Sequence, residues 1–181
     1  NKSYIDTLSI PNFENRLTID LKFPLKNLFY DKFKNTIEIF NSRLGSMTKF
    51  CLDNLNIYEP SVVSFASDKT IWVLDRSKNK LYKVSETGVK TYEKGNPFYV
   101  QNKFYFPTQF IDLKNIVVAL DLNYGIFLID DYGNLMQDIP IDSATKIFRF
   151  QEDIMVSNRT NLNRYRYNPA TKTLEKGTKS L

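Results

Sequence analysis

Short apolar runs separated by small polar turns make up most of this chain. The apolar positions follow the two-residue period of β-strands, and helical periodicity is poor throughout. The seven prolines fall almost always between the runs, as expected where strands connect. The pattern therefore predicts an all-β protein.

Four runs repeat a common pattern, a β-branched or aromatic strand that ends in Asn or Asp. These repeats are Asn35–Asn41, Lys69–Asp75, Asn115–Asp121 and Glu152–Asn158. A polar turn and another strand follow each of them. These following strands are Met47–Leu52, Lys80–Val84, Gly125–Asp130 and Leu162–Tyr167. The closing residues of the repeats are 34, 46 and 37 positions apart, which brackets the roughly 40-residue unit of four-stranded repeat proteins.

An additional apolar stretch lies upstream of each repeat and is suited to an inner strand. The four stretches are Asn27–Tyr30, Ser61–Phe65, Gln109–Leu113 and Lys146–Phe150. Turn signals such as Glu86-Thr87-Gly88 leave room for a short last strand. Four strands therefore fit into each repeat.

This succession of strand, Asn or Asp, turn and strand resembles the bacterial β-propellers of the NHL, TolB and six-bladed sensor type. The resemblance covers about residues 25–177, and Lys80–Val84 with its Glu-Thr-Gly turn is typical of it. It implies an all-β, small β-propeller-like domain of about four to five antiparallel blades.

We expect a single propeller-like domain over residues 1–181. Its blade units are expected at residues 25–60, 61–95, 108–144 and 145–177, with an aromatic insertion at 96–107. Residues 1–24 are expected to contribute closing strands, Tyr4–Ile10 and Arg16–Phe23. We expect the N-terminal strand to pair with the C-terminal blade, because an open ring leaves sheet edges exposed.

The insertion is rich in aromatic residues and is predicted to form a hairpin around Gln101-Asn102-Lys103. These aromatic side chains have two interpretations. If they are exposed, they supply binding energy at a protein interface, and if they pack into a blade, they are part of the core. Tyr124 lies in a turn and is expected to be exposed, since turns run over the surface. The predicted partner-binding residues are Phe98, Tyr99, Phe104, Tyr105, Phe106 and Tyr124.

Charge changes this picture little. The chain has 25 Lys and Arg residues and 20 Asp and Glu residues, which gives a formal net charge of +5. The charge is unevenly distributed, since acidic residues predominate in residues 114–153 and basic residues predominate in the tail after Ser157. In that tail Arg164 and Arg166 alternate with tyrosines, as in a stacking platform for single-stranded nucleic acid or in a solvated strand. The strand interpretation is favoured, and no nucleic-acid partner is expected.

Candidate chemistry is sparse. The chain has no histidine, which removes the basis for Ser-His-Asp or Cys-His catalysis and for histidine-bound metals. It has no phosphate-binding glycine loop and no cysteine pair, and its one cysteine, Cys51, is interpreted as a small buried apolar residue. We therefore predict no cofactor and no metal site.

Acidic residues are the remaining candidates. Asp75 and Asp121 occupy equivalent repeat positions, where they are able to act as an acid/base pair or to cap turns, and capping is favoured. Asp130–Asn134 is interpreted as a structural turn in preference to a calcium site. Trp72, the only tryptophan, is expected to pack between adjacent blades.

These observations favour binding over catalysis. We expect a non-enzymatic, protein-binding accessory subunit of a bacterial cell-envelope assembly, docked on a larger envelope protein such as an outer-membrane β-barrel transporter or secretion channel. The start at Asn1 without Met suggests a removed signal peptide and a location in the periplasm or cell envelope. The longest apolar run, Ile116–Leu120, is too short for a transmembrane helix. The alternative is a small carbohydrate-active or ligand-binding propeller that uses Asp75 and Asp121.

Overall fold

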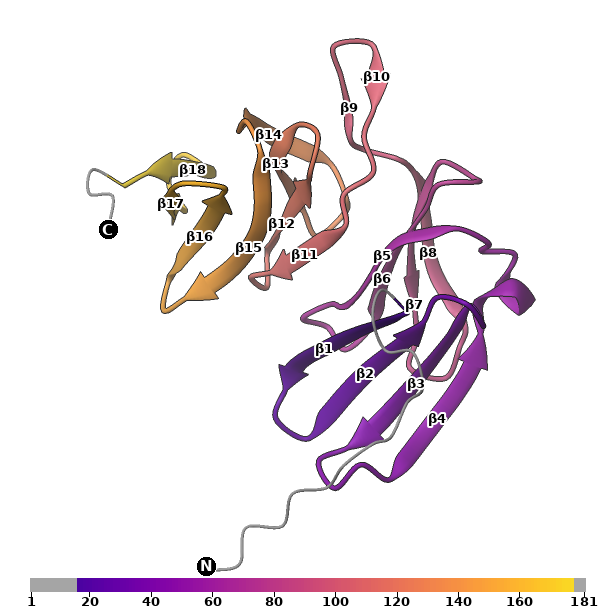
Figure 1. Ribbon diagram of the computed structural model, residues 1–181. Coiled ribbons are helices and arrows are strands. Elements are labelled where there is room, and N and C mark those ends of the chain that lie inside the picture. The colour runs from indigo at the N-terminus through magenta and orange to yellow at the C-terminus, as the bar shows by residue number, and fades with distance from the viewer. Residues whose placement is uncertain (1–15, 178–181) are drawn as a thin grey trace, which may run out of the picture.

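The computed structural model describes residues 16–177, which form four antiparallel four-stranded sheets and one small hairpin (Figure 1). Blade 1 contains β1 (Leu17–Phe23), β2 (Lys26–Asp31), β3 (Thr36–Asn41) and β4 (Ser46–Cys51), followed by a 3-10 turn at Leu52–Leu55. Blade 2 contains β5 (Pro60–Phe65), β6 (Ile71–Asp75), β7 (Lys80–Val84) and β8 (Lys90–Gly95). The hairpin contains β9 (Tyr99–Val100) and β10 (Lys103–Phe104). Blade 3 contains β11 (Gln109–Asp112), β12 (Ile116–Asp121), β13 (Gly125–Asp130) and β14 (Leu135–Pro140). Blade 4 contains β15 (Ala144–Phe150), β16 (Asp153–Asn158), β17 (Leu162–Asn168) and β18 (Thr173–Lys176).

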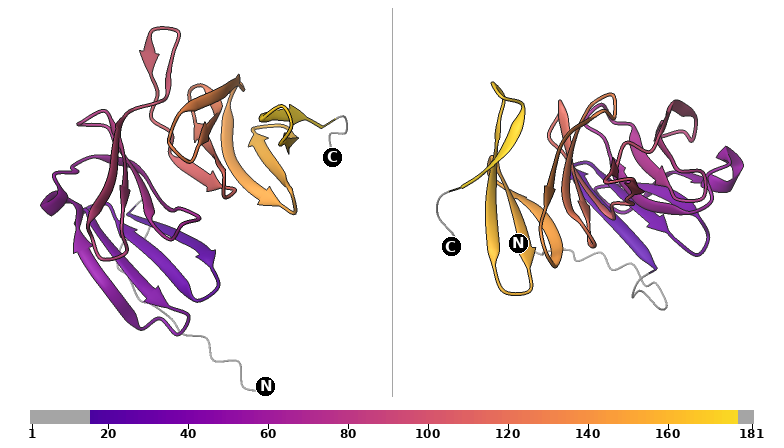
Figure 2. Two further views of the ribbon diagram at one scale, coloured as in Figure 1. Left: turned by 180° about the vertical axis from the view of Figure 1, so that it is seen from behind. Right: turned by 90° about the horizontal axis from the view of Figure 1, so that it is seen from above.

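The predicted all-β fold with four antiparallel blades is confirmed. In every blade the strands pair in chain order, so each blade is an up-and-down meander. The blades follow one another around a common centre, and blades 1 and 4 lie at the two ends of the resulting arc (Figures 1 and 2). Among the described residues, the main packing contacts between sheets join each blade to the next along the chain, and none joins blade 1 to blade 4.

The core consists of three apolar clusters, one between each pair of consecutive blades. The first joins Leu28 and Ile37 of blade 1 to Phe65 and Val73 of blade 2. The second lies between blades 2 and 3, and the third between blades 3 and 4. Each large apolar side chain buried in this way contributes about 1.5–3 kcal/mol, so the contacts between blades hold the arc together.

Blade 3 shows how position in the arc determines sequence pattern. It is packed on both faces, and every residue of β12 is buried. Both faces of this strand therefore need apolar side chains, which is why Ile116–Leu120 is a continuous apolar run without alternation. The turn that follows requires Gly125, whose φ is +134°, because a Cβ there would lie 2.4 Å from the carbonyl oxygen of Ile139.

Blade 1 corrects the sequence prediction. Arg16–Phe23 was expected to help close the ring, but β1 pairs with β2 and forms the inner strand of blade 1. The predicted inner strand Asn27–Tyr30 is therefore the second strand, and Asn41 ends the third strand. The residue equivalent to Asp75 is Asp31. The other expected closing strand, residues 4–10, lies outside the described residues.

Trp72 confirms the expectation that it packs between blades. Its ring is fully buried in the cluster between blades 2 and 3, and its Nε1 donates a hydrogen bond of 3.3 Å to Asp112 of blade 3. Cys51 differs from the prediction, because it is only half-buried at the end of β4. No helix in residues 16–177 is long and apolar enough to cross a membrane.

Candidate partner-binding site

Asp75 is a structural carboxylate. It is fully buried at the end of β6, where Oδ2 accepts a hydrogen bond of 3.0 Å from the amide of Tyr58. Oδ1 accepts bonds from the amides of Glu59, at 3.1 Å, and Ser77, at 2.9 Å. One carboxylate thus caps its own turn and also holds the connection that enters blade 2.

Asp121 repeats this arrangement one blade later. Its Oδ1 accepts a bond of 2.8 Å from the amide of Asn123 in its own turn, and its Oδ2 accepts one of 3.0 Å from the amide of Phe106 in the preceding connection. Because Asp75 and Asp121 are satisfied by backbone amides at separate turns, the alternative that they form an acid/base pair is wrong.

The turn at Asp130 is also structural. Asp130 Oδ1 accepts hydrogen bonds from the amides of Tyr132, at 2.9 Å, and Asn134, at 2.8 Å, as in a capped turn. Within residues 16–177 no three metal-ligating side chains of the His, Cys, Asp and Glu types gather at one place.

The basic tail is folded into blade 4. Arg164 and Arg166 both bind the buried carboxylate of Asp153, with Nε to oxygen distances of 2.7 and 2.8 Å. The hydrogen bonds from these guanidinium groups lower the pKa of Asp153. Tyr165 is buried against blade 3, so its ring is not free to stack on a base. The solvated-strand interpretation of this segment fits these contacts better than a stacking platform.

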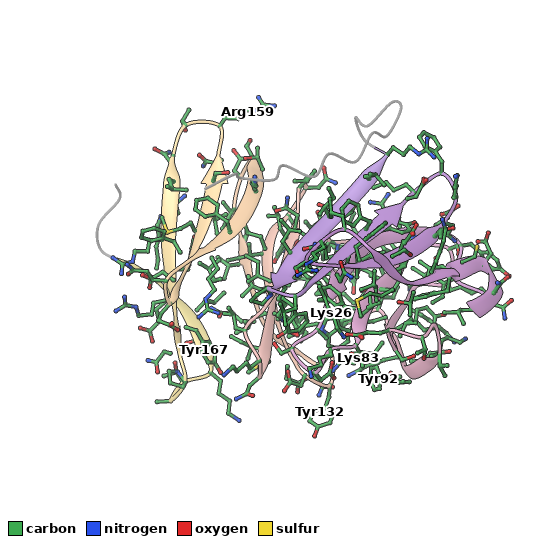
Figure 3. The ribbon with its side chains drawn as sticks, turned by 90° about the horizontal axis from the view of Figure 1, so that it is seen from below. Lys26, Lys83, Tyr92, Tyr132, Arg159 and Tyr167 are labelled. Atoms are coloured by element: carbon green, nitrogen blue, oxygen red, sulfur yellow. The ribbon has the colours of Figure 1, made fainter. Side chains whose placement is uncertain are left out.

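Charged and tyrosine side chains on one edge of the molecule make contacts within blade 2 and between blades 2 and 3. Figure 3 shows Lys83, Tyr92 and Tyr132 near one another at this edge, with Arg159 at the opposite edge. Tyr92 donates a hydrogen bond of 2.7 Å to the carbonyl oxygen of Tyr132, which joins blade 2 to blade 3. Lys83 lies over the ring of Trp72 at 4.4 Å. The Tyr92 bond therefore helps to hold blades 2 and 3 together, and the Lys83 contact lies within blade 2.

The aromatic insertion forms the predicted hairpin. Its two strands meet at a tight turn in which Gln101 and Asn102 have φ values of +53° and +60°. Two consecutive residues with positive φ are typical of a type I′ turn, whose twist matches that of the strands it joins. The hairpin extends beyond the sheets from the connection between blades 2 and 3 (Figure 1).

The base of the hairpin is fixed to the core by Phe98. This ring is fully buried, with centroids 5.2 Å from Phe127 and 5.9 Å from Phe110. Asn96 holds the same segment, since its Oδ1 accepts the amide of Phe98 at 2.9 Å and its Nδ2 donates to the carbonyl oxygen of Tyr105 at 2.9 Å. The hairpin is therefore anchored at its base.

Three further predicted contact residues also pack inward. Tyr105 and Phe106 are half-buried against the cluster between blades 2 and 3. Tyr124 was expected to be exposed but is buried, because Tyr105 covers it with ring centroids 4.7 Å apart. Burial and a hydrogen bond donated to Asp138 raise the pKa of Tyr124 to about 12.

Tyr99 and Phe104 are the two predicted contact residues that remain exposed. They face each other across the hairpin, with ring centroids 4.6 Å apart, and are 49% and 42% exposed. Alternation along each strand explains this arrangement, because Phe98 and Tyr105 point to the core while their neighbours point away. The hairpin thus presents a paired aromatic surface, which we call the Tyr99/Phe104 pair.

The sequence did not indicate a second feature, the central groove. It has a volume of about 920 Å³ and is lined by the inner strands of all four blades. Among the described residues, its only lining carboxylate is Asp20, which accepts bonds from the amides of Lys22, at 2.9 Å, and Phe65, at 2.8 Å. Two carboxylates are needed for glycoside hydrolysis, and the described lining supplies one.

Comparison with known proteins identifies the fold. No protein-family description matches the chain, and no curated protein matches it in sequence. Solved structures do match. One is a protein of Bacteroides fragilis described as exported, with 12% identity, a TM-score of 0.59, and coverage of 91% of this chain and 50% of that one. BamB from Moraxella catarrhalis has 8% identity and a TM-score of 0.52, and the match covers 86% of this chain and 47% of BamB. A virginiamycin B lyase from Staphylococcus aureus, crystallised with quinupristin, has 14% identity and a TM-score of 0.63, and the match covers 93% of this chain and 57% of the lyase.

The fold is a β-propeller. At these low identities the likeness extends to the fold alone. The chain spans about half the length of each of these propellers. The lyase crystallised with quinupristin is a catalytically inactive variant in which one histidine is replaced by alanine. At 14% identity the similarity does not transfer the chemistry of the lyase to this chain.

Proposed function

We propose that the protein is a non-enzymatic, protein-binding accessory subunit of a bacterial cell-envelope assembly. In this proposal the hairpin β9–β10 docks the propeller on a larger envelope protein through the Tyr99/Phe104 pair. The observation that carries the proposal is that this pair is exposed on a segment whose base is anchored in the core. Aromatic side chains of this kind are enriched among the residues that dominate binding energy.

Anchoring makes the hairpin suitable for recognition. The buried ring of Phe98 and the two hydrogen bonds of Asn96 fix the base of the hairpin before any partner binds. A segment that is ordered in advance loses less conformational entropy on association, which increases affinity. The Tyr99/Phe104 pair is therefore presented in a defined geometry.

The cell envelope is proposed as the location because a similar propeller, from Bacteroides fragilis, is described as an exported protein. An outer-membrane transporter or secretion channel is the kind of partner proposed. Such proteins are large and expose loops at the membrane surface, where a small propeller is able to dock.

The test is affinity purification of the tagged protein from the envelope fraction of its natural host in mild detergent, with quantitative mass spectrometry. We expect one envelope protein in near-stoichiometric amount, and at least a tenfold lower recovery with Tyr99→Ala/Phe104→Ala. A tenfold loss corresponds to about 1.4 kcal/mol, less than the ~2 kcal/mol expected for one strong contact residue.

The matched control is Tyr58→Ala. Tyr58 lies in the connection between blades 1 and 2, the position that corresponds to the hairpin one blade later, and is 47% exposed. This variant should recover the partner as well as the wild type does. Recovery that is equal for the wild type and the hairpin variant, or no co-purifying envelope protein at all, would contradict the proposal.

The central groove favours a second candidate, binding of a small molecule along the propeller axis. Its size is within the usual range for ligand sites, and Lys32 and Lys146 give it two cationic side chains. An anionic ligand fits this charge best. Calorimetric titration with anionic sugars tests it, and binding that is lost in Lys32→Glu/Lys146→Glu would support the groove as a site.

A further inference from the structure

Two exposed cationic residues lie over aromatic rings of the hairpin segment, residues 96–108. The guanidinium carbon of Arg76, in the turn between β6 and β7, is 5.7 Å from the ring centroid of Phe106. The Nζ of Lys103, on β10, is 5.1 Å from the ring centroid of Tyr105. The face of an aromatic ring attracts cations, so both side chains are held against the hairpin segment.

The turn that carries Arg76 is bonded to the hairpin segment. The amide of Asn96 donates a hydrogen bond of 2.9 Å to the carbonyl oxygen of Asn79, and Nδ2 of Asn96 donates one of 3.0 Å to Oδ1 of Asn79. Asn96 is also the residue that accepts the amide of Phe98. Arg76 is therefore held at the anchored base of the hairpin.

Neither cation forms an ion pair within the part of the chain that the structure describes. In residues 16–177 no carboxylate oxygen lies within 4 Å of the charged nitrogens of Arg76 or Lys103. Glu59 accepts the amide of Arg76 through its carbonyl oxygen at 2.9 Å, but its carboxylate does not pair with the guanidinium. Residues 94–111 include no Asp or Glu, so the hairpin segment supplies no counter-charge of its own.

The hairpin combines an aromatic side with cationic groups. Adjacent residues of a strand point to opposite faces, so Lys103 projects from the side of β10 opposite to the Tyr99/Phe104 pair. The guanidinium of Arg76 presents a planar fork of donors that matches a carboxylate, and the ammonium group of Lys103 pairs with a carboxylate as a point charge. A partner that encloses the hairpin is therefore complementary to it when it offers apolar groups on one side and carboxylates on the other.

We propose that the partner binds the hairpin with an acidic segment, whose Asp and Glu side chains pair with Arg76 and Lys103 while apolar side chains cover the Tyr99/Phe104 pair. This inference rests on the proposed docking function and adds the chemistry of the partner's surface to it. Complementary charge steers association and disfavours partners that are basic at the same place. A protein segment fits better than a flat lipid surface, because the hairpin projects beyond the sheets and Arg76 lies at its base (Figure 1).

The first part of the experiment compares charge reversals of the full chain in affinity purification from the envelope fraction. Arg76→Glu/Lys103→Glu should lower recovery of the partner at least tenfold, and the neutral Arg76→Gln/Lys103→Gln should lower it less. The matched control is Arg43→Glu/Lys172→Glu, which replaces the same number of charges and should recover the partner as the wild type does. Arg43 and Lys172 are exposed in turns between third and fourth strands, at the end of the sheets opposite to the hairpin.

The second part is carbodiimide coupling of the purified complex, which joins an amine directly to a carboxylate in contact with it. Mass spectrometry should find Lys103 joined to an Asp or Glu of the partner, and position 76 joined as well in Arg76→Lys.

The outcomes separate this inference from the docking function. A partner that depends on the Tyr99/Phe104 pair, but is recovered fully by Arg76→Glu/Lys103→Glu and is not coupled to Lys103, would overturn the acidic segment and leave docking intact. Absence of any partner would overturn both. Binding of the wild type to phosphatidylglycerol vesicles that is lost in Arg76→Glu/Lys103→Glu would assign the two cations to lipid and overturn the proposal.

Discussion

At the scale of single residues, aspartates at the ends of the second strands of blades 1 to 3 hold the following turns in place. Asp31, Asp75 and Asp121 each follow a run of β-branched or aromatic residues, and each accepts backbone amides of its own turn. Asp75 and Asp121 also accept amides from the preceding connection. At the buried positions of Asp75 and Asp121, a charged acceptor therefore fixes both the turn and the entry to the blade.

Removal of one such carboxylate should be costly. Asp75→Ala leaves the amides of Tyr58, Glu59 and Ser77 without their acceptor, and we expect a loss of about 2–3 kcal/mol in the free energy of unfolding. Urea denaturation measures it. Asp142→Ala, which removes an exposed carboxylate, is the control and should change stability by less than about 0.5 kcal/mol. Equal stability of the two variants would contradict the structural role.

Acid should weaken blade 4 through Asp153. Its two arginine partners hold its pKa below the ordinary value of 3.8, so the carboxylate contributes stability above that pH and loses it as the pH falls through the lower value. We expect Asp153→Asn to have a lower melting temperature than the wild type at pH 7, with the difference shrinking below about pH 4. Melting curves between pH 7 and 2 measure this, and a difference independent of pH would be inconsistent with the ion pairs.

At the scale of elements, the hairpin separates anchoring from recognition. Phe98→Ala removes a fully buried ring between blades 2 and 3, and we expect a loss of about 3–5 kcal/mol in stability. Tyr99→Ala removes a half-exposed ring and should cost less than about 1 kcal/mol. Chemical denaturation of both variants provides the comparison. A loss of stability for Tyr99→Ala as large as that for Phe98→Ala would show that the hairpin tip is part of the core.

The sequence predicted the later three blades better than the first. A strand that ends in Asn or Asp is a local signal, and β3, which ends at Asn41, has this signal as clearly as β2, which ends at Asp31. Which of the two is the second strand of the blade depends on pairing with β1, a contact between segments distant along the chain. Local pattern therefore located the strands of blade 1 but assigned them wrongly within the blade.

The same limit applies to the candidate site. The hairpin and its turn could be predicted from the positions of Gln101 and Asn102, since tight turns have a local signature. The burial of Tyr124 could not be predicted, because the ring that covers it, Tyr105, belongs to a separate segment of the chain. The central groove also gave no local signal, as it forms only when inner strands from four blades converge.

At the scale of the whole molecule, the blades make a scaffold that presents one projecting segment. Consecutive blades are joined by continuous apolar clusters, and the hairpin leaves this scaffold between blades 2 and 3 with its aromatic pair exposed (Figure 1). A scaffold of this kind holds a binding element in a fixed orientation, which is the property that the proposed docking role requires.

The most direct test of this role is photo-crosslinking in living cells. Phe104 is replaced by p-benzoyl-phenylalanine, and Tyr58 is replaced in the same way as the control at a similarly exposed position. We expect one discrete crosslinked product between position 104 and a larger envelope protein, and none from position 58. Absence of a product from position 104, or the same product from both positions, would contradict docking through the hairpin.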